Sequence, residues 1–363
     1  MKLMSISGTR PEIIKQSRIY SKLDANFEHV MVFTNQNYTP ELSDIFFSDL
    51  QVRKPDYNLK IKTNGFGIEV ADIISKTEQV MIKEKPDVLV LLGDVNSGLS
   101  AIPAAHHGIK IVHLEAGMRS YDNRMPEEKN RVLIDHLATI NLPYTEYSRQ
   151  NLIRENIHPG SIYVVGNPII EVINHYLPKI EKSDILGKLK LKPNDYVLVT
   201  AHRSENVDDP KTLMNIISGL EKVYIKFKKR IIYPMHPRTL SKLNKKSIPK
   251  CVEIIKPLGF FEFSKLEQNA FCYVTDSGTL PEDALYYQKP CVIIRESTER
   301  PEFIEAGCNI LSGLDPKNIV DSVKTITSAS RDWQWNNSLG DGKTSSKVVN
   351  IIRGKLVRIP SKF

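Results

Sequence analysis

The sequence of 363 residues has few of the features that define specialised protein classes. It contains four cysteines, with no CxxC pair and no Cys/His spacing of the kind that binds a metal, so neither a disulfide framework nor a metal site is indicated. No apolar stretch is long enough to span a bilayer and no signal peptide is recognisable, so we expect a cytoplasmic protein that does not associate with membranes. Cys272 and Cys291 lie in apolar runs, which predicts buried, reduced thiols.

Charge and motif content exclude two further classes. The formal net charge is +8, but the lysines are spread out apart from short runs such as 228–230 and 245–246, so we do not expect nucleic-acid binding. A positive balance of this size suits an anionic small substrate. No Gly-x-Gly-x-x-Gly motif follows a strand-like run, so a dinucleotide cofactor is not indicated, and we expect neither a cofactor nor a metal.

Short apolar runs alternate regularly with helical patterns, which predicts an α/β protein with parallel, doubly wound sheets. The length suits two domains, and we place the break near Gly166-Asn167-Pro168, giving domains of residues 1–167 and 168–344. Ligands in such sheets bind beyond the carboxyl ends of the strands, so we expect the two domains to face one cleft. The expected strands are residues 2–6, 28–33, 88–92, 109–113, 141–145, 162–165, 196–200, 230–233, 252–255, 271–274 and 291–295.

A small turn after one apolar run predicts an anion site. The run 270–274 ends at Thr275-Asp276-Ser277-Gly278-Thr279 and enters a helical pattern, so backbone N–H groups and the helix dipole would face a ligand there. Glu282 and Asp283 follow one turn later, placed to face sugar hydroxyls, and Arg300 follows the next apolar run, placed to bind a phosphate. Together they suggest a pocket for a nucleoside diphosphate. An ordinary strand–helix turn with a capping acid is the alternative.

The start of the chain repeats this pattern. The strand-like run 2–6 leads into Gly8-Thr9-Arg10-Pro11-Glu12, where Thr9 suits a helix cap and Pro11 suits the first helical turn. Arg10 and Lys15 would then flank a helix N-terminus. They are either solvated basic residues or the edge of a second anion site.

Several motifs in a fixed order carry a resemblance over nearly the whole chain. The sequence resembles the non-hydrolysing UDP-N-acetylglucosamine 2-epimerases of bacteria and archaea. The motifs are Gly8-Thr9-Arg10-Pro11-Glu12, Leu92-Gly93-Asp94, His113-Leu114-Glu115-Ala116-Gly117-Met118-Arg119-Ser120, Arg124-Met125-Pro126-Glu127-Glu128-Lys129-Asn130-Arg131, Thr200-Ala201-His202-Arg203 and the region 277–302.

The resemblance implies a fold and an activity. It implies a GT-B-like pair of Rossmann-like domains, with a last helix within residues 345–363 packing back onto the first domain and the second domain binding the nucleotide. The implied reaction interconverts UDP-N-acetylglucosamine and UDP-N-acetylmannosamine by anti elimination of UDP and re-addition with the proton delivered to the other face of carbon 2. Such a reaction needs acid–base groups near carbon 2 and cations near the departing diphosphate. We also expect a homodimer.

Three carboxylates are the candidates for acid–base catalysis. Asp94 and Glu115 directly follow apolar runs at the carboxyl ends of expected strands, where a helix cap is as good an explanation as a catalyst. Glu127 follows Pro126 at an apparent helix start, which favours an acid on electrostatic grounds alone. The resemblance implies that all three are the acid–base groups, without assigning a proton transfer to each. We interpret Arg119 and Arg131 as their structural or charge partners.

The remaining site residues are assigned by matching the family's motifs. His202 is implied to hold the diphosphate or assist its departure, although a lone histidine after a strand is equally typical of a turn. The resemblance also implies a uracil-binding loop at Leu258 and Phe263, and His236 is a candidate supporting residue. The implied substrate-binding set is Arg10, Lys15, Leu258, Phe263, Ser277, Gly278, Thr279, Glu282, Asp283 and Arg300.

The sequence departs from the family pattern at several places. Asp283 stands where the family usually has Glu, Thr279 stands where many members have Gly, and Asn35-Gln36-Asn37 replaces the Gly-Gln-His linked in some members to a second, regulatory substrate site. The segments 166–171 and 54–57 resemble relatives that act on 6-deoxy UDP-sugars, such as UDP-2-acetamido-2,6-dideoxy-L-talose, toward UDP-N-acetyl-L-fucosamine.

Three other functions remain open at this point. A GT-B glycosyltransferase shares the implied fold and nucleotide pocket, but it has no need of acids around carbon 2. A non-catalytic UDP-sugar sensor would bind without turnover. A hydrolysing epimerase usually has a different turn after the first strand.

Overall fold

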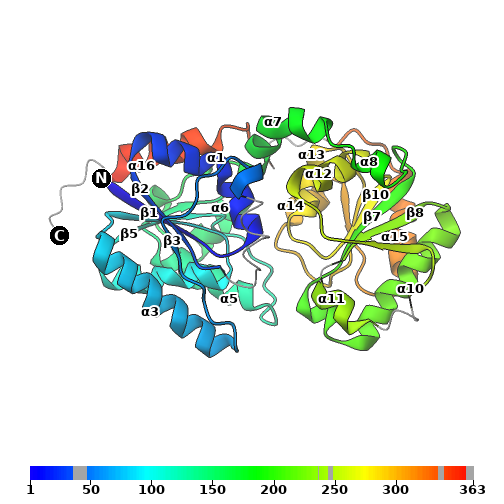
Figure 1. The fold of residues 1–363 in the computed structure, drawn as a ribbon, viewed down its shortest axis with the longest axis horizontal. Coiled ribbons are helices and arrows are strands. Elements are labelled where there is room, and N and C mark those ends of the chain that lie inside the picture. Colours follow the sequence, from blue (N-terminus) through cyan, green and yellow to red (C-terminus); the bar gives the residue numbers. More distant parts are fainter. Residues whose placement is uncertain (36–46, 236, 244–247, 334–338, 357–363) are drawn as a thin grey trace. The chain divides into compact units, whose positions relative to one another are not determined.

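Two six-stranded sheets, each parallel throughout, form the frame of the protein in the computed structural model (Figure 1). The structure describes residues 1–35, 47–235, 237–243, 248–333 and 339–356. The chain divides into two compact units, Met1–His175 with Asn337–Phe363, and Tyr176–Asn336, which we call the first and second unit. The helix α7 (Pro168–Glu181) runs across the division at His175.

The first unit contains a sheet of order β3-β2-β1-β4-β5-β6. Its strands are β1 (Lys2–Ser7), β2 (Glu28–Phe33), β3 (Tyr57–Asn58), β4 (Val88–Leu92), β5 (Lys110–Leu114) and β6 (Ile140–Leu142). β1 lies between β2 and β4, so the strand order reverses at the β1/β4 pair. In open α/β sheets this reversal is where ligands bind, beyond the carboxyl ends of the strands.

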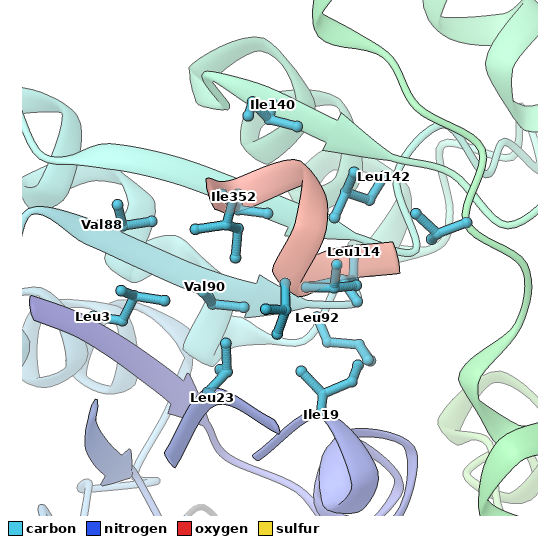
Figure 2. Packing of buried hydrophobic residues seen from close by; sticks show 14 residues of the cluster. Leu3, Ile19, Leu23, Val88, Val90, Leu92, Leu114, Ile140, Leu142 and Ile352 are labelled. Carbon is cyan, nitrogen blue, oxygen red and sulfur yellow. The ribbon is translucent and has the colours of Figure 1, made fainter. Parts of the chain in front are cut away.

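Side chains on the two faces of this sheet pack against different helices. Val88, Val90 and Leu92 of β4 belong to the cluster drawn in Figure 2, which includes residues of α1 and α16. Leu89 and Leu91 point to the opposite face, because side chains alternate along a strand, and pack with residues of α3, α4 and α5. The helices of this unit are α1 (Arg10–Asn26), α3 (Phe66–Glu84), η1 (Asn96–Ser100), α4 (Ala101–His106), α5 (Pro126–Leu137), α6 (Glu146–Arg154), η2 (Pro159–Ser161) and α16 (Thr344–Leu356).

The second unit repeats the architecture, with strand order β12-β11-β10-β7-β8-β9. Its strand order reverses at the β7/β10 pair, which is again the position where open α/β sheets bind ligands. Its strands are β7 (Tyr196–Thr200), β8 (Arg230–Pro234), β9 (Val252–Ile255), β10 (Cys272–Thr275), β11 (Cys291–Ile293) and β12 (Asn309–Leu311). Its helices are α8 (Ile185–Lys188), α9 (Ser204–Val207), α10 (Pro210–Phe227), α11 (Pro237–Lys242), α12 (Phe260–Asn269), α13 (Leu280–Tyr286), α14 (Pro301–Glu305) and α15 (Pro316–Ser328).

The predicted fold class, an α/β protein with two doubly wound parallel sheets, is confirmed. The predicted strand at 162–165 is not formed as a regular strand, although Ile162 bridges Asn141 and the backbone N–H groups of Tyr163 and Val165 donate to the carbonyl oxygens of Asn141 and Pro143. The short edge strands β3 and β12 were not expected. Cys272 and Cys291 are buried and free, as predicted.

Two further findings apply to the described part of the chain. None of its helices combines the length and apolarity needed to traverse a lipid bilayer. Within the same residues, no cluster of three or more His, Cys, Asp or Glu side chains is arranged to hold a metal ion.

Candidate active site

The turn after β1 is fixed by a buried carboxyl group. Thr9 caps α1, and Glu12 accepts hydrogen bonds from the backbone N–H groups of Gly8 (2.9 Å) and Thr9 (2.7 Å). The hydroxyl of Ser97, in the segment after β4, donates to the other oxygen of Glu12 at 3.0 Å. Burial raises the pKa of Glu12 to about 7, although these donors act to lower it. Glu12 therefore ties the turn that carries Arg10 to the segment that carries Asp94.

Glu115 follows β5 in the left-handed region, with φ of 68°. A residue other than glycine adopts this conformation only when its surroundings hold it there, and such residues gather at functional sites. Its Oε2 accepts hydrogen bonds from Lys15 Nζ at 2.8 Å and from the Tyr144 hydroxyl at 2.9 Å. The Lys15 Nζ also lies 5.3 Å from the centre of the Tyr144 ring. The structure thus brings together two predicted site residues, Lys15 and Glu115.

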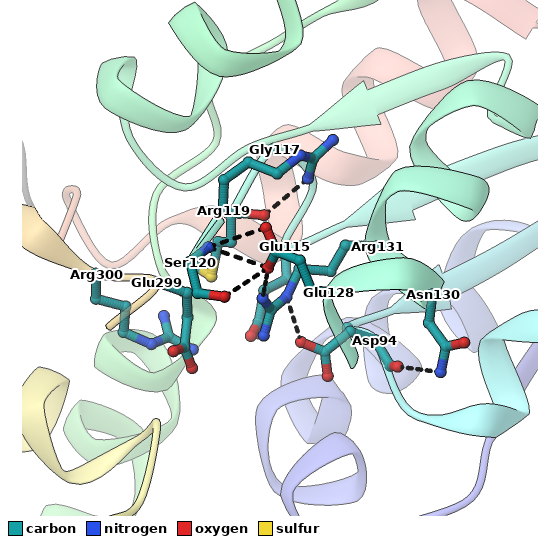
Figure 3. Close-up of polar contacts among 12 residues, drawn as sticks. Asp94, Glu115, Gly117, Arg119, Ser120, Glu128, Asn130, Arg131, Glu299 and Arg300 are labelled. Atoms are coloured by element: carbon teal, nitrogen blue, oxygen red, sulfur yellow. Dashed lines mark hydrogen bonds and ion pairs between the residues drawn. The ribbon is translucent and has the colours of Figure 1, made fainter. Parts of the chain in front are cut away.

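Asp94 is held by Arg131, as Figure 3 shows. The Nε of Arg131 donates to Asp94 Oδ2 at 2.7 Å, and its Nη1 donates to Glu128. Glu128 also accepts from the backbone N–H groups of Ser120 and Tyr121. Arg131 is almost fully buried, whereas the Asp94 side chain is 20% exposed. The arrangement leaves the Asp94 carboxylate accessible while fixing its position.

Glu127, the third predicted carboxylate, has a different environment. It is half-buried in the first turn of α5, beside the fully anchored Glu128. It makes no hydrogen bond or ion pair with any residue that the structure describes. The carboxylate is therefore available to a ligand, while α5 holds its backbone.

Another buried carboxylate, Asp135 of α5, binds β5 and the turn that follows it. It accepts from Arg119 Nη2 at 2.8 Å and from the backbone N–H of Gly117 at 3.1 Å, and it pairs with His113 Nδ1 at 2.7 Å. Burial alone would raise the pKa of Asp135, but the bonds and charges of His113 and Arg119 bring this pKa below its ordinary value. Arg119 also binds Glu155, so its acidic partners among the described residues are Asp135 and Glu155 and not one of the three predicted carboxylates. Arg131, in contrast, contacts the predicted carboxylate Asp94.

In the second unit, Asp276 organises the loop that carries His202. Asp276 is fully buried and its carboxylate accepts from the backbone N–H groups of His202 and Arg203, each at 2.9 Å. Asn206 donates to the same oxygen at 3.1 Å. The His202 side chain itself is 51% exposed, with Nδ1 3.7 Å from Asp276 Oδ1. The turns after β7 and β10 therefore lie together, and His202 is open to a ligand.

The turn at 277–279 is held by its own side chains. The backbone N–H of Thr279 donates to Ser277 Oγ at 3.2 Å, and that of Ser277 donates to Thr275 Oγ1 at 2.9 Å. A side chain at Gly278 would place its Cβ 2.8 Å from Glu299 Oε1 and 3.4 Å from Arg203 Nη2. A side chain at this position would therefore displace the Glu299 carboxylate. Two of the three backbone donors that were expected to bind phosphate are occupied within the turn.

Arg300 and the acids of α13 form buried pairs within the second unit. Arg300 Nη1 binds Glu282 Oε1, and both side chains are almost fully buried. Asp283 is buried and hydrogen-bonded to Glu267, whose pKa burial raises well above its ordinary value and the charge of Asp283 raises further. Burial and the charge of Asp283 therefore both favour the protonated form of the Glu267 carboxyl group.

The remaining predicted site residues are those of the expected uracil-binding loop, His236 and Arg10. Leu258 and Phe263 are partly buried and pack against the hydrophobic core of the second unit. His236 lies outside the described residues. Arg10 is partly exposed at the start of α1.

Sequence reasoning missed several residues that position the predicted ones. Glu12 and Glu128 stand inside recognised motifs, and Asp276 follows an apolar run at a strand end, so strand-end position was a usable signal for Asp276. Tyr144 and Asp135 had no such signal, because Tyr144 lies inside the predicted strand 141–145 and Asp135 lies inside α5.

Glu302 gives the second unit a pH-dependent stability. It is buried at the start of α14, and burial raises its pKa from 4.5 to about 7. Folding therefore favours the protonated form, so the contribution of Glu302 is fully present below pH 4.5 and is lost as pH rises through 7. At about 1.4 kcal/mol per pKa unit, the loss reaches roughly 3 kcal/mol by pH 8.

We expect Glu302→Gln to raise the thermal unfolding midpoint at pH 8 and to leave it nearly unchanged at pH 4.5, because the amide carries no charge at either pH. The measurement is differential scanning fluorimetry at both values. Glu305→Gln is the matched control, since Glu305 lies in the same helix and is exposed. Equal effects of Glu302→Gln at the two pH values would contradict the assignment.

The pair of doubly wound parallel sheets defines a GT-B-like α/β protein. A solved glycosyltransferase of lipopolysaccharide biosynthesis matches 98% of this chain and 100% of its own with a TM-score of 0.62, and at 10% identity this likeness shows the fold alone.

The family is shown by closer comparisons. The model of the UDP-N-acetylglucosamine 2-epimerase family matches residues 21–353, and the chain belongs to this family of isomerases. The UDP-N-acetylglucosamine 2-epimerase of Methanococcus maripaludis is 40% identical, over 98% of this chain and 99% of the relative. The crystal structure of the Methanocaldococcus jannaschii UDP-GlcNAc 2-epimerase, in complex with UDP-GlcNAc and UDP, superimposes with a TM-score of 0.92 at 38% identity and covers 98% of this chain and 100% of that chain.

Proposed function

We propose that the protein is a non-hydrolysing 2-epimerase that interconverts UDP-N-acetylglucosamine and UDP-N-acetylmannosamine. The observation that carries the proposal is the set of carboxylates at the β4 and β5 strand ends, each paired with a buried cation. Lys15 binds Glu115 and Arg131 binds Asp94. A relative matched over 98% of this chain carries the epimerase name, and a solved epimerase structure matched over the same share is in complex with UDP-GlcNAc and UDP.

The proposed reaction removes the hydrogen at carbon 2 while UDP departs from carbon 1. The electron pair of the C2–H bond forms the C1–C2 double bond, the electron pair of the C1–O bond leaves with UDP, and a carboxylate takes the proton. UDP then adds back to carbon 1 as a proton is delivered to the other face of carbon 2. Two opposite faces require two groups, and the first unit offers Asp94, Glu115 and Glu127 for them.

The cations of the first unit can stabilise the negative charge that develops on the departing diphosphate. Lys15 is buried against Glu115 and the Tyr144 ring, so its ammonium group has a fixed position. A preorganised cation stabilises the charge that appears on a departing diphosphate without reorganising during the reaction. We assign this role to Lys15 with Arg10 at the start of α1.

In the second unit we propose a site for the UDP group at the β7/β10 strand ends. His202 is exposed there on a loop held by Asp276, and Arg300 is positioned by Glu282. We propose that Ser277, Gly278 and Thr279 contact the diphosphate, and that Asp283, at the start of α13 beside this turn, accepts from the ribose hydroxyls. Leu258 and Phe263 would contact the uracil.

Proton NMR in deuterated water tests the function. We expect UDP-N-acetylglucosamine, incubated with protein and no acceptor, to yield UDP-N-acetylmannosamine with deuterium at carbon 2, without added NAD or metal. Product that retains its original hydrogen at carbon 2 would contradict the mechanism. Unchanged substrate would instead indicate a transferase or a sensor, and free UDP with free sugar would indicate a hydrolysing enzyme.

Two further properties complete the proposal. We propose that the enzyme acts in the cytoplasm and forms a homodimer, which light scattering would test. The first unit has a surface hollow of about 950 Å³ lined in part by exposed apolar side chains of Ile102, Val132 and Leu133. Lys129 and Glu155 also line this hollow, so opposite charges are present that could pair across a two-fold interface.

A further inference from the structure

His113 joins two turns that carry predicted carboxylates. It is the fourth residue of β5 and shares the sheet face of Ile111, which packs toward α5. Its side chain is almost fully buried. Nδ1 lies 2.7 Å from Asp135 Oδ1, and Nε2 lies 2.9 Å from the backbone oxygen of Gly93. Both ring nitrogens therefore have a partner in the protein.

The identity of these partners fixes the protons on the ring. The Gly93 carbonyl oxygen accepts and never donates, so Nε2 carries a proton. A bare Nδ1 would oppose its lone pair to a carboxylate oxygen at 2.7 Å, so a second proton lies between His113 and Asp135. Gly117 N–H and Arg119 donate to Asp135 and stabilise its ionised form, so this second proton belongs to Nδ1.

The charged pair connects the backbone of all three carboxylate segments. Gly93 precedes Asp94, and Gly117, which donates to Asp135, lies two residues after Glu115. Asp135 belongs to α5, the helix that begins beside Glu127 and also supplies the Arg131 that binds Asp94. A rigid ring with a donor at each end sets the distance between the turn after β4 and helix α5.

Stability alone does not account for such a pair. Burying two charges costs free energy, and replacing a buried ion pair by apolar side chains is often neutral or stabilising. The neighbouring positions on the same sheet face, Leu89, Leu91 and Ile111, are apolar and fully buried. An apolar side chain at position 113 would therefore suit the core equally well. The presence of a charged ring is explained instead by the turns that His113 holds.

We propose that His113 is a positioning residue of the epimerase, a buried imidazolium that donates to Asp135 and to the Gly93 carbonyl and thereby holds Asp94 and Glu115 in place for proton transfer. This inference rests on the proposed function. His113 touches no reacting atom, and it acts through the turns that it joins.

The protonation state is measured first, on the unmodified protein. Nitrogen-15 NMR with labelled histidine should show one side chain with protons on both ring nitrogens at pH 7.5, protected from exchange with water. Its signal is assigned by its disappearance in His113→Gln, or in His113→Asn if the glutamine variant does not fold. A His113 ring with one unprotonated nitrogen at this pH would overturn the proposal, whatever the activity of the variants.

Kinetics of His113→Gln provide the second test. A misplacement of catalytic groups by about 1 Å costs on the order of 100-fold in rate, so we expect kcat to fall about 100-fold while calorimetry shows unchanged UDP affinity. The control is His107→Gln, because His107 is exposed and its Nε2 pairs with Glu78 at 2.8 Å, away from the predicted carboxylates. Normal kcat in His113→Gln would overturn the proposal, whereas normal kcat in Glu115→Gln would instead overturn the proposed function.

Discussion

Replacing Glu115 by glutamine should lower kcat at least about 100-fold, because general acid–base groups typically contribute 100- to 10,000-fold. The amide keeps the shape of the side chain and can still accept a hydrogen bond from Lys15 or Tyr144, but it cannot take a proton from carbon 2. We expect losses of the same order in Asp94→Asn and Glu127→Gln, with UDP binding retained in each. The measurement is turnover from both UDP-N-acetylglucosamine and UDP-N-acetylmannosamine.

The exchange of deuterium into each substrate shows which carboxylate serves which face. A variant that lacks the base for one epimer should lose exchange at carbon 2 of that epimer first. Glu146→Gln is the control, since Glu146 is an exposed acid in the same unit. If two of the three carboxylate variants keep near-normal turnover, the assignment of the acid–base groups is wrong.

Replacing Arg131 by methionine should lower the free energy of unfolding by about 3–5 kcal/mol, which is the usual cost of removing one partner from a buried ion pair. Arg131 is the shared donor for Asp94 and Glu128, so its loss leaves two carboxylates facing each other without a cation. We also expect turnover to fall beyond detection, since Asp94 loses the bond that orients it. Denaturant unfolding followed by circular dichroism measures the first effect.

Arg124 offers a matched comparison in the same segment. It pairs with Asp122, but its side chain is 69% exposed, so Arg124→Met should cost no more than about 1 kcal/mol. The double variant Arg131→Met with Glu128→Gln should recover part of the stability, because one carboxylate is neutralised, but none of the turnover. A loss below 1 kcal/mol in Arg131→Met would refute the role assigned to this arginine.

The sequence predicted the bounds of four strands correctly, of which β4 and β7 are buried along their whole length, whereas β2 and β9 are only partly buried. The predicted ranges 28–33, 88–92, 196–200 and 252–255 coincide with β2, β4, β7 and β9. It failed where a distant segment decides the path of the chain. Tyr163 and Val165 bond to the backbone of Asn141 and Pro143, but the chain then turns at Gly166, whose φ is 84°, and Asn167 N–H bonds to Leu339 O, so this pairing goes no further. The edge strand β3 has two residues and depends on pairing with β2.

For the candidate site, too, the sequence indicates residues that follow strands but not the distant residues that hold them. Asp94, Glu115 and His202 follow strands, so topology alone indicates that they lie near ligand-binding edges. The resemblance to a family named their roles. Neither source gives the partner that holds each of them, because Tyr144 and Asp276 reach their partners from other strand ends, 29 and 74 residues away. Such pairs become visible only when the fold brings the strand ends together.

The position of α16 has a consequence for folding of the chain during its synthesis on the ribosome. Val348, Val349 and Ile352 share one hydrophobic cluster with Leu3 and Ile19, near the other end of the chain. Domains that are continuous in sequence close as soon as they emerge, N-terminal first. Here the earliest-made sheet keeps one apolar face incomplete until the entire second unit has been synthesised and the final helix has left the exit tunnel. Throughout that interval the nascent chain presents an open hydrophobic surface, which is the kind of surface that chaperones bind.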